Sequence, residues 1–231
     1  MSDTLSLALV LIPCLIVAIV FHEVAHGWAA LALGDPTAKE RKRLSLNPLR
    51  HVDPVGTILV PGALALMSGP IFGWAKPVPV NKNRLDDPRF GMMAVAAAGP
   101  AMNFLLAAVG AIAIGILGLG EEVFLTDSAI TGEAAPLAQG LFYFLLINIF
   151  LGIFNLLPIP PFDGSHIVEG LMPRRYVHLY EKIRPFGMIL FVGLIAVTWF
   201  APELGVLQNT IGPPVNWAMS KYISLAGLFS S

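Results

Sequence analysis

The stretch Phe21-His22-Glu23-Val24-Ala25-His26-Gly27-Trp28-Ala29-Ala30 contains the pattern His-Glu-x-x-His inside an apolar run over about 5–33. Positions i and i+4 of an α-helix share one face, so His22 and His26 can both bind one zinc ion. Glu23 then lies beside that ion, where it can act on a water molecule as the catalytic residue. A charged glutamate in hydrocarbon is costly unless it faces a partner or water. The stretch therefore predicts a metal site built inside a membrane.

The composition agrees with a membrane protein. Of the 231 residues, 56% are hydrophobic and 13% are charged, and the mean hydropathy is +0.74. Soluble domains have about 25% charged residues, so this chain has about half the usual supply. A net charge of −1 offers no basic excess for binding nucleic acid. The single cysteine, Cys14, excludes an internal disulfide and a cysteine-rich zinc site, and we interpret it as a packed residue of the first helix.

Five apolar segments are each long enough to cross roughly 30 Å of hydrocarbon. They cover approximately 5–33, 91–119, 138–158, 186–203 and 205–228. Prolines and polar residues interrupt the last segment, which is therefore the weakest. We expect one all-α polytopic membrane domain over 1–231, with about five to six transmembrane helices. Its core covers about 5–170 and its peripheral helices about 186–228.

A sixth apolar run, 55–72, contains prolines and glycines that break helices. The 14 Lys and Arg residues decide how this run is interpreted. They follow the first span, precede the second and fourth, and end with one near the C-terminus: Lys39, Arg41, Lys42, Arg43, Arg50, Lys76, Lys82, Arg84, Arg89, Arg174, Arg175, Lys182, Arg184 and Lys221. The loop 120–137 instead has four acidic residues and no Lys or Arg. A re-entrant hairpin at 55–72 would keep every basic loop on one side of the membrane.

Short basic loops stay in the cytoplasm. We therefore expect an integral protein of the cell membrane (plasma or inner), with the N-terminus outside and the C-terminus in the cytoplasm. The first span then places the two histidines in its cytoplasmic half, so the active site faces that side. After the hairpin, the segment Trp74-Ala75-Lys76-Pro77-Val78-Pro79-Val80-Asn81 alternates valine with proline, which forbids a helix and fits a short edge β-strand.

A catalytic zinc site needs a third protein ligand. His51 and His178 stand in basic loops, where surface positions are expected, and His166 is the remaining histidine. Asp163 is the better candidate, because it follows the prolines that end the third span in Asn155-Leu156-Leu157-Pro158-Ile159-Pro160-Pro161-Phe162-Asp163-Gly164. Those prolines stop the helix and let the carboxylate point back into the bundle. The third span also runs inward, so Asp163 should arrive at a depth similar to that of His22.

Two separated motifs, His22-Glu23-x-x-His26 and Asn155-x-x-Pro158-x-Pro160-x-x-Asp163-Gly164, resemble the site-2 protease family of intramembrane zinc metalloproteases. The resemblance covers roughly 10–35 and 91–170. It implies one zinc ion per chain, bound by the two histidines and Asp163, with Glu23 as the catalytic base. The chain departs from the family pattern at Phe162, commonly Leu, and Ser165, commonly Gly, but neither change removes a ligand. Without a PDZ domain, it is similar to the small members.

Two asparagines are candidate substrate-binding residues. Asn103 lies in Gly99-Pro100-Ala101-Met102-Asn103, which is similar to the family's glycine-to-asparagine motif. Its amide could bind the carbonyls released before Pro100, a substrate, or a neighbouring helix, and the sequence leaves these alternatives open. The amide of Asn155 could hold a ligand or an oxyanion.

The expected reaction is hydrolysis of a peptide bond in or near a transmembrane segment of a substrate protein, with the lipid bilayer as the other partner. The extended segment 76–81 could bind the unwound substrate along its edge. Two alternatives remain: an ion- or proton-coupled transporter, and an inactive zinc-binding membrane protein. Absence of internal repeats argues against the transporter. The sequence identifies neither the substrate nor the oligomeric state.

Overall fold

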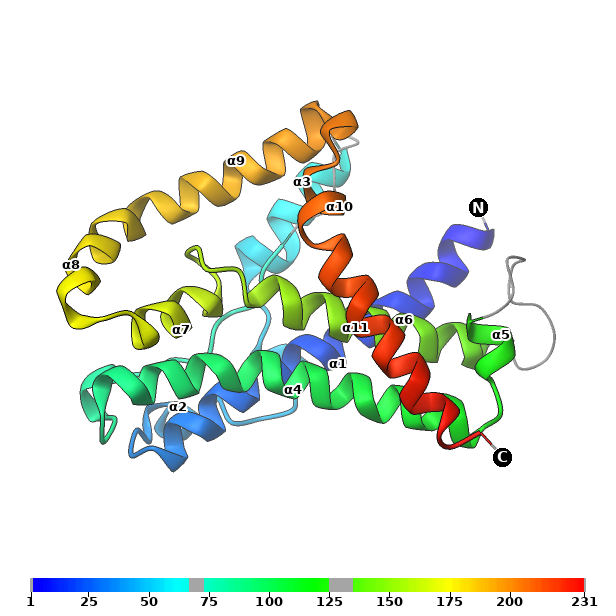
Figure 1. The fold of residues 1–231 in the computed structure, drawn as a ribbon, viewed down its shortest axis with the longest axis horizontal. Helices are drawn as coiled ribbons and strands as arrows, with labels where there is room; N and C mark the ends of the chain where they lie inside the picture. The colour runs from blue at the N-terminus through cyan, green and yellow to red at the C-terminus, as the bar shows by residue number, and fades with distance from the viewer. Residues whose placement is uncertain (1, 67–72, 125–134, 231) are drawn as a thin grey trace.

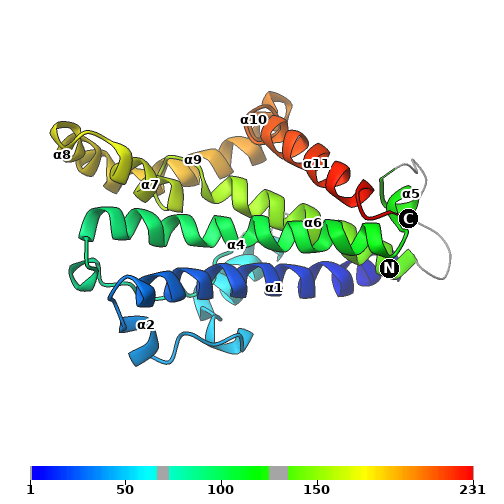
Figure 2. The ribbon, with the colours of Figure 1, turned by 60° about the horizontal axis from the view of Figure 1, so that its bottom comes forward.

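The computed structural model describes residues 2–66, 73–124 and 135–230. Three long helices form its centre: α1 (Ser2–Ala32), α4 (Pro88–Ile116) and α6 (Ala135–Asn155). They lie side by side in Figures 1 and 2. Side-chain bonds from Asn103 of α4 to Ala18 O and from His26 to Val95 O show that α1 and α4 are antiparallel.

Helix α4 begins where the sequence supplies a capping residue. The Asp87 carboxylate accepts hydrogen bonds from the backbone N–H groups of Arg89 and Phe90, and Pro88 occupies the first helical position. Many of the buried positions of α4 are glycine or alanine, which let neighbouring helices approach closely: Gly91, Ala96, Gly99, Ala107, Gly110, Ala111 and Gly115.

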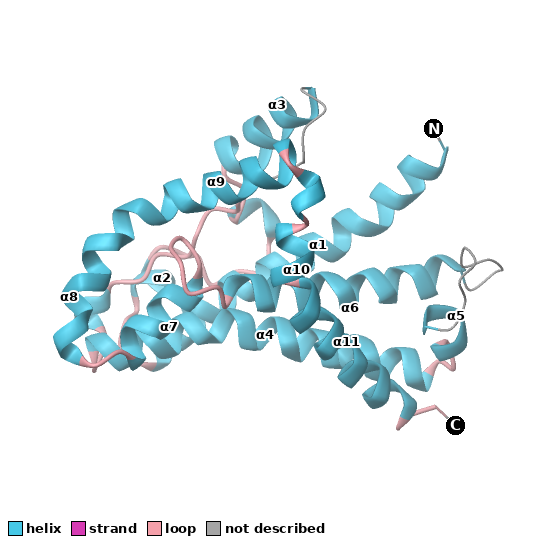
Figure 3. Ribbon diagram, turned by 45° about the horizontal axis from the view of Figure 1, so that its top comes forward, coloured by secondary structure: helices cyan, strands magenta, loops and turns pink. Residues whose placement is uncertain are grey.

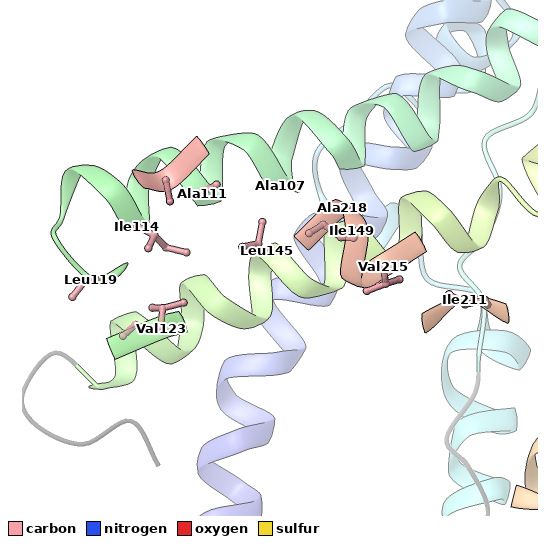
Figure 4. Close-up of a cluster of buried hydrophobic side chains, with 12 residues drawn as sticks. Ala107, Ala111, Ile114, Leu119, Val123, Leu145, Ile149, Ile211, Val215 and Ala218 are labelled. Carbon is pink, nitrogen blue, oxygen red and sulfur yellow. The ribbon is translucent and has the colours of Figure 1, made fainter. Parts of the chain in front are cut away.

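The main apolar core fills the half of the bundle opposite to the basic loops. Figure 4 shows this cluster, which joins α4 and α6 to α5 (Gly120–Phe124) and α11 (Gly212–Gly227). Ile114, Leu145 and Ile149 are its largest fully buried apolar side chains. A second, smaller cluster of Ala30, Leu85 and Val95 holds the other end of α1 against α4. Along α4, the residues that face the histidine pair, Gly99 and Asn103, lie between Val95 of the second cluster and Ala107 of the first.

Short elements follow α1 at the end that carries the basic residues. They are α2 (Thr37–Glu40), η1 (Pro48–Arg50), the π-helical η2 (Pro54–Leu59), α3 (Val60–Leu66) and η3 (Lys82–Arg84). The chain returns beside its point of departure, because the Trp74 N–H donates to Gly56 O (3.0 Å) and the Thr57 hydroxyl donates to Trp74 O (2.9 Å). This return is what a re-entrant element requires. Residues 67–72 of the predicted hairpin lie outside the described residues.

The described residues contain no β-strand, so the short strand expected at 74–81 is not confirmed (Figure 3). The prolines at 77 and 79 remove two of the N–H donors that a strand ladder needs. The segment is instead held by hydrogen bonds to scattered partners. One of these is the backbone carbonyl of His51, which accepts from the Lys76 N–H.

Within the described residues, three helices are long and apolar enough to cross a membrane, and a fourth candidate is bent. The three cover Leu7–Ala32, Pro88–Ile116 and Pro136–Asn155, and the bent pair, Arg174–Lys182 with Arg184–Phe200, turns by 41°. The all-α membrane fold is confirmed, but the predicted number of spans is not. The last two predicted segments give only short helices: α9 (Gly187–Phe200), η5 (Pro202–Leu204), α10 (Val206–Thr210) and α11.

The predicted placement of the two termini on opposite sides disagrees with this arrangement. Tyr222 of α11 donates its hydroxyl proton to Phe104 O, and Gly115 of α4 lies against Ala226, so α11 runs parallel to α4. Its end therefore lies with the end of α4 and the start of α1, and Figure 2 shows both termini at the same end of the bundle. The cause is that α9 and α11 both run away from the basic end (Figure 1) instead of forming an antiparallel pair.

Candidate metal centre

His22 and His26 lie one turn apart on α1 and face α4. Both are buried, with 7% and 9% of their surface exposed. Their Nε2 atoms are 3.0 Å apart, and their rings are nearly perpendicular, with an interplanar angle of 87°. The helical spacing therefore brings the two imidazoles together as the sequence predicts.

Asp163 reaches the histidine pair from a turn and is the first residue of α7 (Asp163–Leu171). Its Oδ2 atom lies 3.1 Å from His22 Nε2 and 3.3 Å from His26 Nε2. The turn needs a glycine next to Asp163, because a Cβ atom on Gly164 would lie 2.2 Å from Leu156 O. Of the described His, Cys, Asp and Glu residues, only these three form a group able to hold a metal ion.

The hydrogen bonds of the two imidazoles fix where their protons lie. His22 Nδ1 lies 2.6 Å from Asn103 Oδ1, and His26 Nδ1 lies 2.7 Å from Val95 O. Both partners are carbonyl oxygens that only accept, so each Nδ1 carries the ring proton. In the neutral rings each Nε2 then holds a lone pair and cannot donate to the other. The two lone pairs and the carboxylate of Asp163 thus face one another without a proton between them.

This arrangement fits a bound cation. Asp163 Oδ2 is buried and has no conventional hydrogen-bond donor, and three electron-rich atoms at this distance repel one another unless a positive ion lies among them. Tetrahedral zinc with ligand bonds of about 2.0–2.1 Å separates its ligand atoms by roughly 3.3 Å. The observed separations of 3.0, 3.1 and 3.3 Å are close to that value. Two histidines and one carboxylate also form a known catalytic zinc set with an open fourth position.

Gly99 provides the space for the imidazoles on the surface of α4. A Cβ atom at this position would lie 2.4 Å from His26 Nε2 and 2.6 Å from His22 Cε1. Real Cβ atoms do not approach other heavy atoms so closely, and the rings cannot retreat because their Nδ1 atoms are bonded to α4. The glycine of the motif thus serves the metal centre.

Glu23 is held by the segment that follows the re-entrant element. The backbone N–H of Val78 donates to Glu23 Oε2 over 2.8 Å. Because Pro77 and Pro79 have no N–H group, Val78 supplies the sole backbone donor of this Pro-Val-Pro stretch. The segment itself is anchored by Arg43, whose Nη2 donates to Lys76 O over 2.7 Å. Glu23 is thus held by a partner outside the three candidate ligands.

The structure brings Asn103 into the metal centre but leaves Asn155 outside it. Asn103 is fully buried and bonds to His22, not to the carbonyls before Pro100. Asn155 donates its amide to Leu151 O of its own helix, and its side chain shows no bond to the metal-binding group in the described part of the chain. A direct substrate-binding role for Asn103 is therefore a poor fit to its contacts.

Sequence analysis missed two residues and misplaced one. Asn148 is fully buried and bonds to Asn103; an asparagine in the middle of an apolar span was the signal that could have identified it. Val78 acts through its backbone, which side-chain motifs do not show. His51 is 3% exposed and bonds to Ser45 O, so the expected surface position was wrong, whereas His178 is exposed.

The sequence profile of peptidase family M50 matches residues 10–198. A protein of Bacillus subtilis (strain 168) named "Putative zinc metalloprotease YwhC" is 39% identical over 191 residues, which are 82% of this chain and 81% of that protein. A protein of Mycolicibacterium smegmatis (strain ATCC 700084 / mc(2)155) named "Putative zinc metalloprotease Rip2" is 23% identical over 186 residues, or 78% of this chain and 64% of that protein. No solved structure matches the chain significantly.

The family match covers both motifs, the helices α4 and α6, and α1 from residue 10 onward. It agrees with the donor set of the metal centre and with the apolar helices around it. The transporter alternative has no comparable support. The chain therefore belongs to peptidase family M50, the site-2 protease family, and is a zinc metalloprotease of the integral membrane class.

Proposed function

We propose that this protease hydrolyses peptide bonds in or near transmembrane segments of other membrane proteins, as in regulated intramembrane proteolysis. One observation carries the proposal: the two histidines and Asp163 gather three unprotonated ligand atoms between helices that are apolar enough to span a membrane. A site at this place meets substrates that are themselves in the bilayer.

In this proposal each site residue has one task. His22, His26 and Asp163 hold zinc, which when bound polarises the scissile carbonyl and acidifies water. Glu23 accepts a proton from the attacking water and passes it to the leaving amine, so the amide bond breaks while an acid and an amine form. The Val78 N–H holds the carboxylate of Glu23 in place between these proton transfers.

Water and substrate need a route to the centre from the basic side, which we assign to the cytoplasm with the N-terminus outside. A cavity of about 570 Å³ opens there between the start of α4, α7 and α8 (Arg174–Ile183). Its lining includes His166, one turn after Asp163, and three basic side chains: Lys82, Arg89 and Arg184. A cavity with basic side chains in its lining supports entry of water from the cytoplasmic side.

The segment 76–81 supports substrate binding in a narrower way than expected. The N–H groups of Trp74, Lys76 and Val78 are already bonded within the protein. Pro77 and Pro79 have no N–H group to offer. A substrate strand at the outer edge must therefore donate its own N–H groups to the proline carbonyls. Val80→Pro removes the backbone N–H group that follows Pro79 on this edge. It should lower the rate of reporter cleavage without lowering zinc content. Unchanged cleavage would argue against edge binding.

The central experiment compares the purified wild type with Glu23→Gln, and uses Glu40→Gln on the exposed α2 as the matched control. We expect one zinc ion per chain in all three proteins. Cleavage of transmembrane reporters should fall by at least about 10²-fold in Glu23→Gln alone, because the proton carrier is lost. Wild-type protein without zinc, or equal cleavage by Glu23→Gln, would contradict the proposal. Zinc without cleavage in any protein would indicate a binding function.

A further inference from the structure

Two buried asparagines form a continuous chain of hydrogen bonds behind His22. Asn148 Nδ2 donates to Phe144 O over 2.8 Å, and Asn148 Oδ1 accepts from Asn103 Nδ2 over 2.9 Å. Asn103 Oδ1 then faces His22 Nδ1 at 2.6 Å. Both asparagines are fully buried, in α6 and α4 respectively. A side-chain chain of this kind inside apolar helices is retained only if each member is satisfied.

Backbone carbonyls fix the direction of both amides. An amide group can be turned so that its oxygen and nitrogen exchange places, and only its partners decide the orientation. Phe144 O can only accept, so it requires the Nδ2 of Asn148 on its side. Ala18 O, which lies 3.2 Å from Asn103 Nδ2, does the same for Asn103. Each amide therefore presents its oxygen to the next donor, and the chain has one consistent direction.

We infer that Asn148 is a positioning residue for the metal centre, which acts through Asn103 to hold His22 as the Nδ1–H tautomer. The chain ends on an oxygen that only accepts, so the ring proton stays on Nδ1 and the Nε2 lone pair stays free for the metal ion. Without Asn148, one amide proton of Asn103 loses its acceptor, and only the longer bond to Ala18 O (3.2 Å) still opposes turning of the amide. A turned amide would present N–H to His22 and favour the tautomer that cannot bind metal through Nε2.

His26 lacks such a side-chain chain, because its Nδ1 is bonded directly to a backbone carbonyl, Val95 O. A backbone carbonyl cannot exchange its oxygen for a donor. Only the His22 ligand therefore depends on amide orientation, and only this ligand should respond to changes at Asn148. The inference rests on the proposed role of His22 as a ligand, and zinc binding by the wild type tests that role separately.

The test measures the zinc dissociation constant by competition with a chelator, using Asn148→Leu, Asn103→Leu and the double variant. Loss of a residue that hydrogen-bonds to a metal ligand weakens metal binding by about 10–100-fold, and we expect a weakening of this size for Asn103→Leu. Asn148→Leu should weaken it less, by roughly 3–10-fold. The double variant should match Asn103→Leu, because Asn148 acts only through Asn103. If the two single substitutions instead weakened zinc binding independently, so that their fold-changes multiplied in the double variant, the inference would be overturned.

Two further measurements separate positioning from packing. In zinc-free protein, ¹⁵N spectra of the imidazole rings should show His22 with its proton on Nδ1 in the wild type, and a mixture with the Nε2–H tautomer in Asn148→Leu. Asn148→Asp, if protonated in this buried site, donates its O–H to Phe144 O, keeps the acceptor oxygen for Asn103 and should retain wild-type zinc affinity. The control Leu145→Ala, at a buried position of the same helix, should lower the unfolding temperature without changing zinc affinity.

If Asn148→Leu does not fold, Asn148→Ala takes its place in the same affinity and ¹⁵N measurements. An unchanged tautomer together with unchanged affinity would overturn the inference. A wild type that binds no zinc would instead overturn the assignment of His22 as a ligand.

Discussion

At the scale of single residues, Gly99 shows how one missing methyl group makes room for the metal centre. Gly99→Ala should displace both imidazoles, since its Cβ would lie 2.4 Å from His26 Nε2. We expect zinc content to fall to less than about a tenth of the wild-type value, in line with the sensitivity of ligand geometry to its surroundings. Metal analysis of the purified protein gives the measurement.

Gly110→Ala is the control for this change, because it lies on the same helix and the nearest atom to its Cβ would be Phe144 Cδ1 at 3.2 Å. That variant should keep its zinc. A Gly99→Ala protein with a full zinc complement would show that the rings can move away from α4, against the geometry described above.

The residue types of the metal centre could be predicted because each carries its chemistry in its side chain. His22, His26 and Asp163 were identified from spacing and from the proline turn, and the structure places their ligand atoms together. The asparagines that hydrogen-bond behind His22 were harder to identify. Whether an asparagine amide faces a histidine or a lipid depends on the packing of two helices, which the local sequence does not contain.

At the scale of elements, Asp35 fastens the end of α1 to the segment that carries Val78. Asp35 is fully buried. Its carboxylate accepts from the backbone N–H of Thr37 (3.0 Å) and of Asn81 (2.6 Å), and from the Thr37 hydroxyl. Burial raises the pKa of Asp35, but the hydrogen bonds from Thr37 and Asn81 outweigh it, and the pKa lies below its ordinary value.

Asp35→Ala should therefore destabilise the protein by about 2–4 kcal/mol at pH 7, because buried N–H groups lose their acceptor. A lowered native pKa gives stability that is present above the unfolded pKa of about 4 and is lost as the pH falls through the native pKa. The difference in unfolding temperature between the wild type and Asp35→Ala should shrink below about pH 4. Thermal unfolding in detergent, with Asp86→Ala as control, measures it. A difference in unfolding temperature that grows as the pH falls would contradict this account.

The elements themselves were predictable to different degrees. Long apolar runs gave α1, α4 and α6 with boundaries shifted by a few residues, since twenty or more apolar residues have few alternatives to a helix. The stretch 74–81 was harder, because valine favours a strand while proline removes its donors. The partner that decided its course is Glu23, fifty-five residues earlier in the chain.

At the scale of the whole molecule, the sequence placed the basic loops together, and the structure gathers them at one end of the bundle, opposite to α5 (Figure 1). The position of the last helix was not predictable from charge, because Lys221 is the only basic residue after Arg184. Packing decided it instead: the buried positions of α11 fit against α4 and α6 in the apolar core.

This arrangement predicts the accessibility of single cysteines in a Cys14→Ser background. Gly118→Cys and Ser230→Cys lie at the same end of the bundle and should react alike with a membrane-impermeant maleimide in intact cells. Arg41→Cys, among the basic residues, should react only after the membrane is opened. If the cysteines at positions 41 and 230 both reacted only after the membrane is opened, the topology expected from the sequence would be correct and the arrangement of α11 wrong.

The junction between α1 and the turn before α7 also has a consequence for how the enzyme is made. Its metal-binding atoms come from α1 and from a turn that is synthesised only after two further long helices, α4 and α6. A partly synthesised chain holds the His-Glu-x-x-His motif in the membrane among other nascent helices, yet it lacks Asp163. In the proposed mechanism such a chain cannot cleave its neighbours. The order of the segments thus delays proteolytic activity until Asp163 has been synthesised and has joined the two histidines.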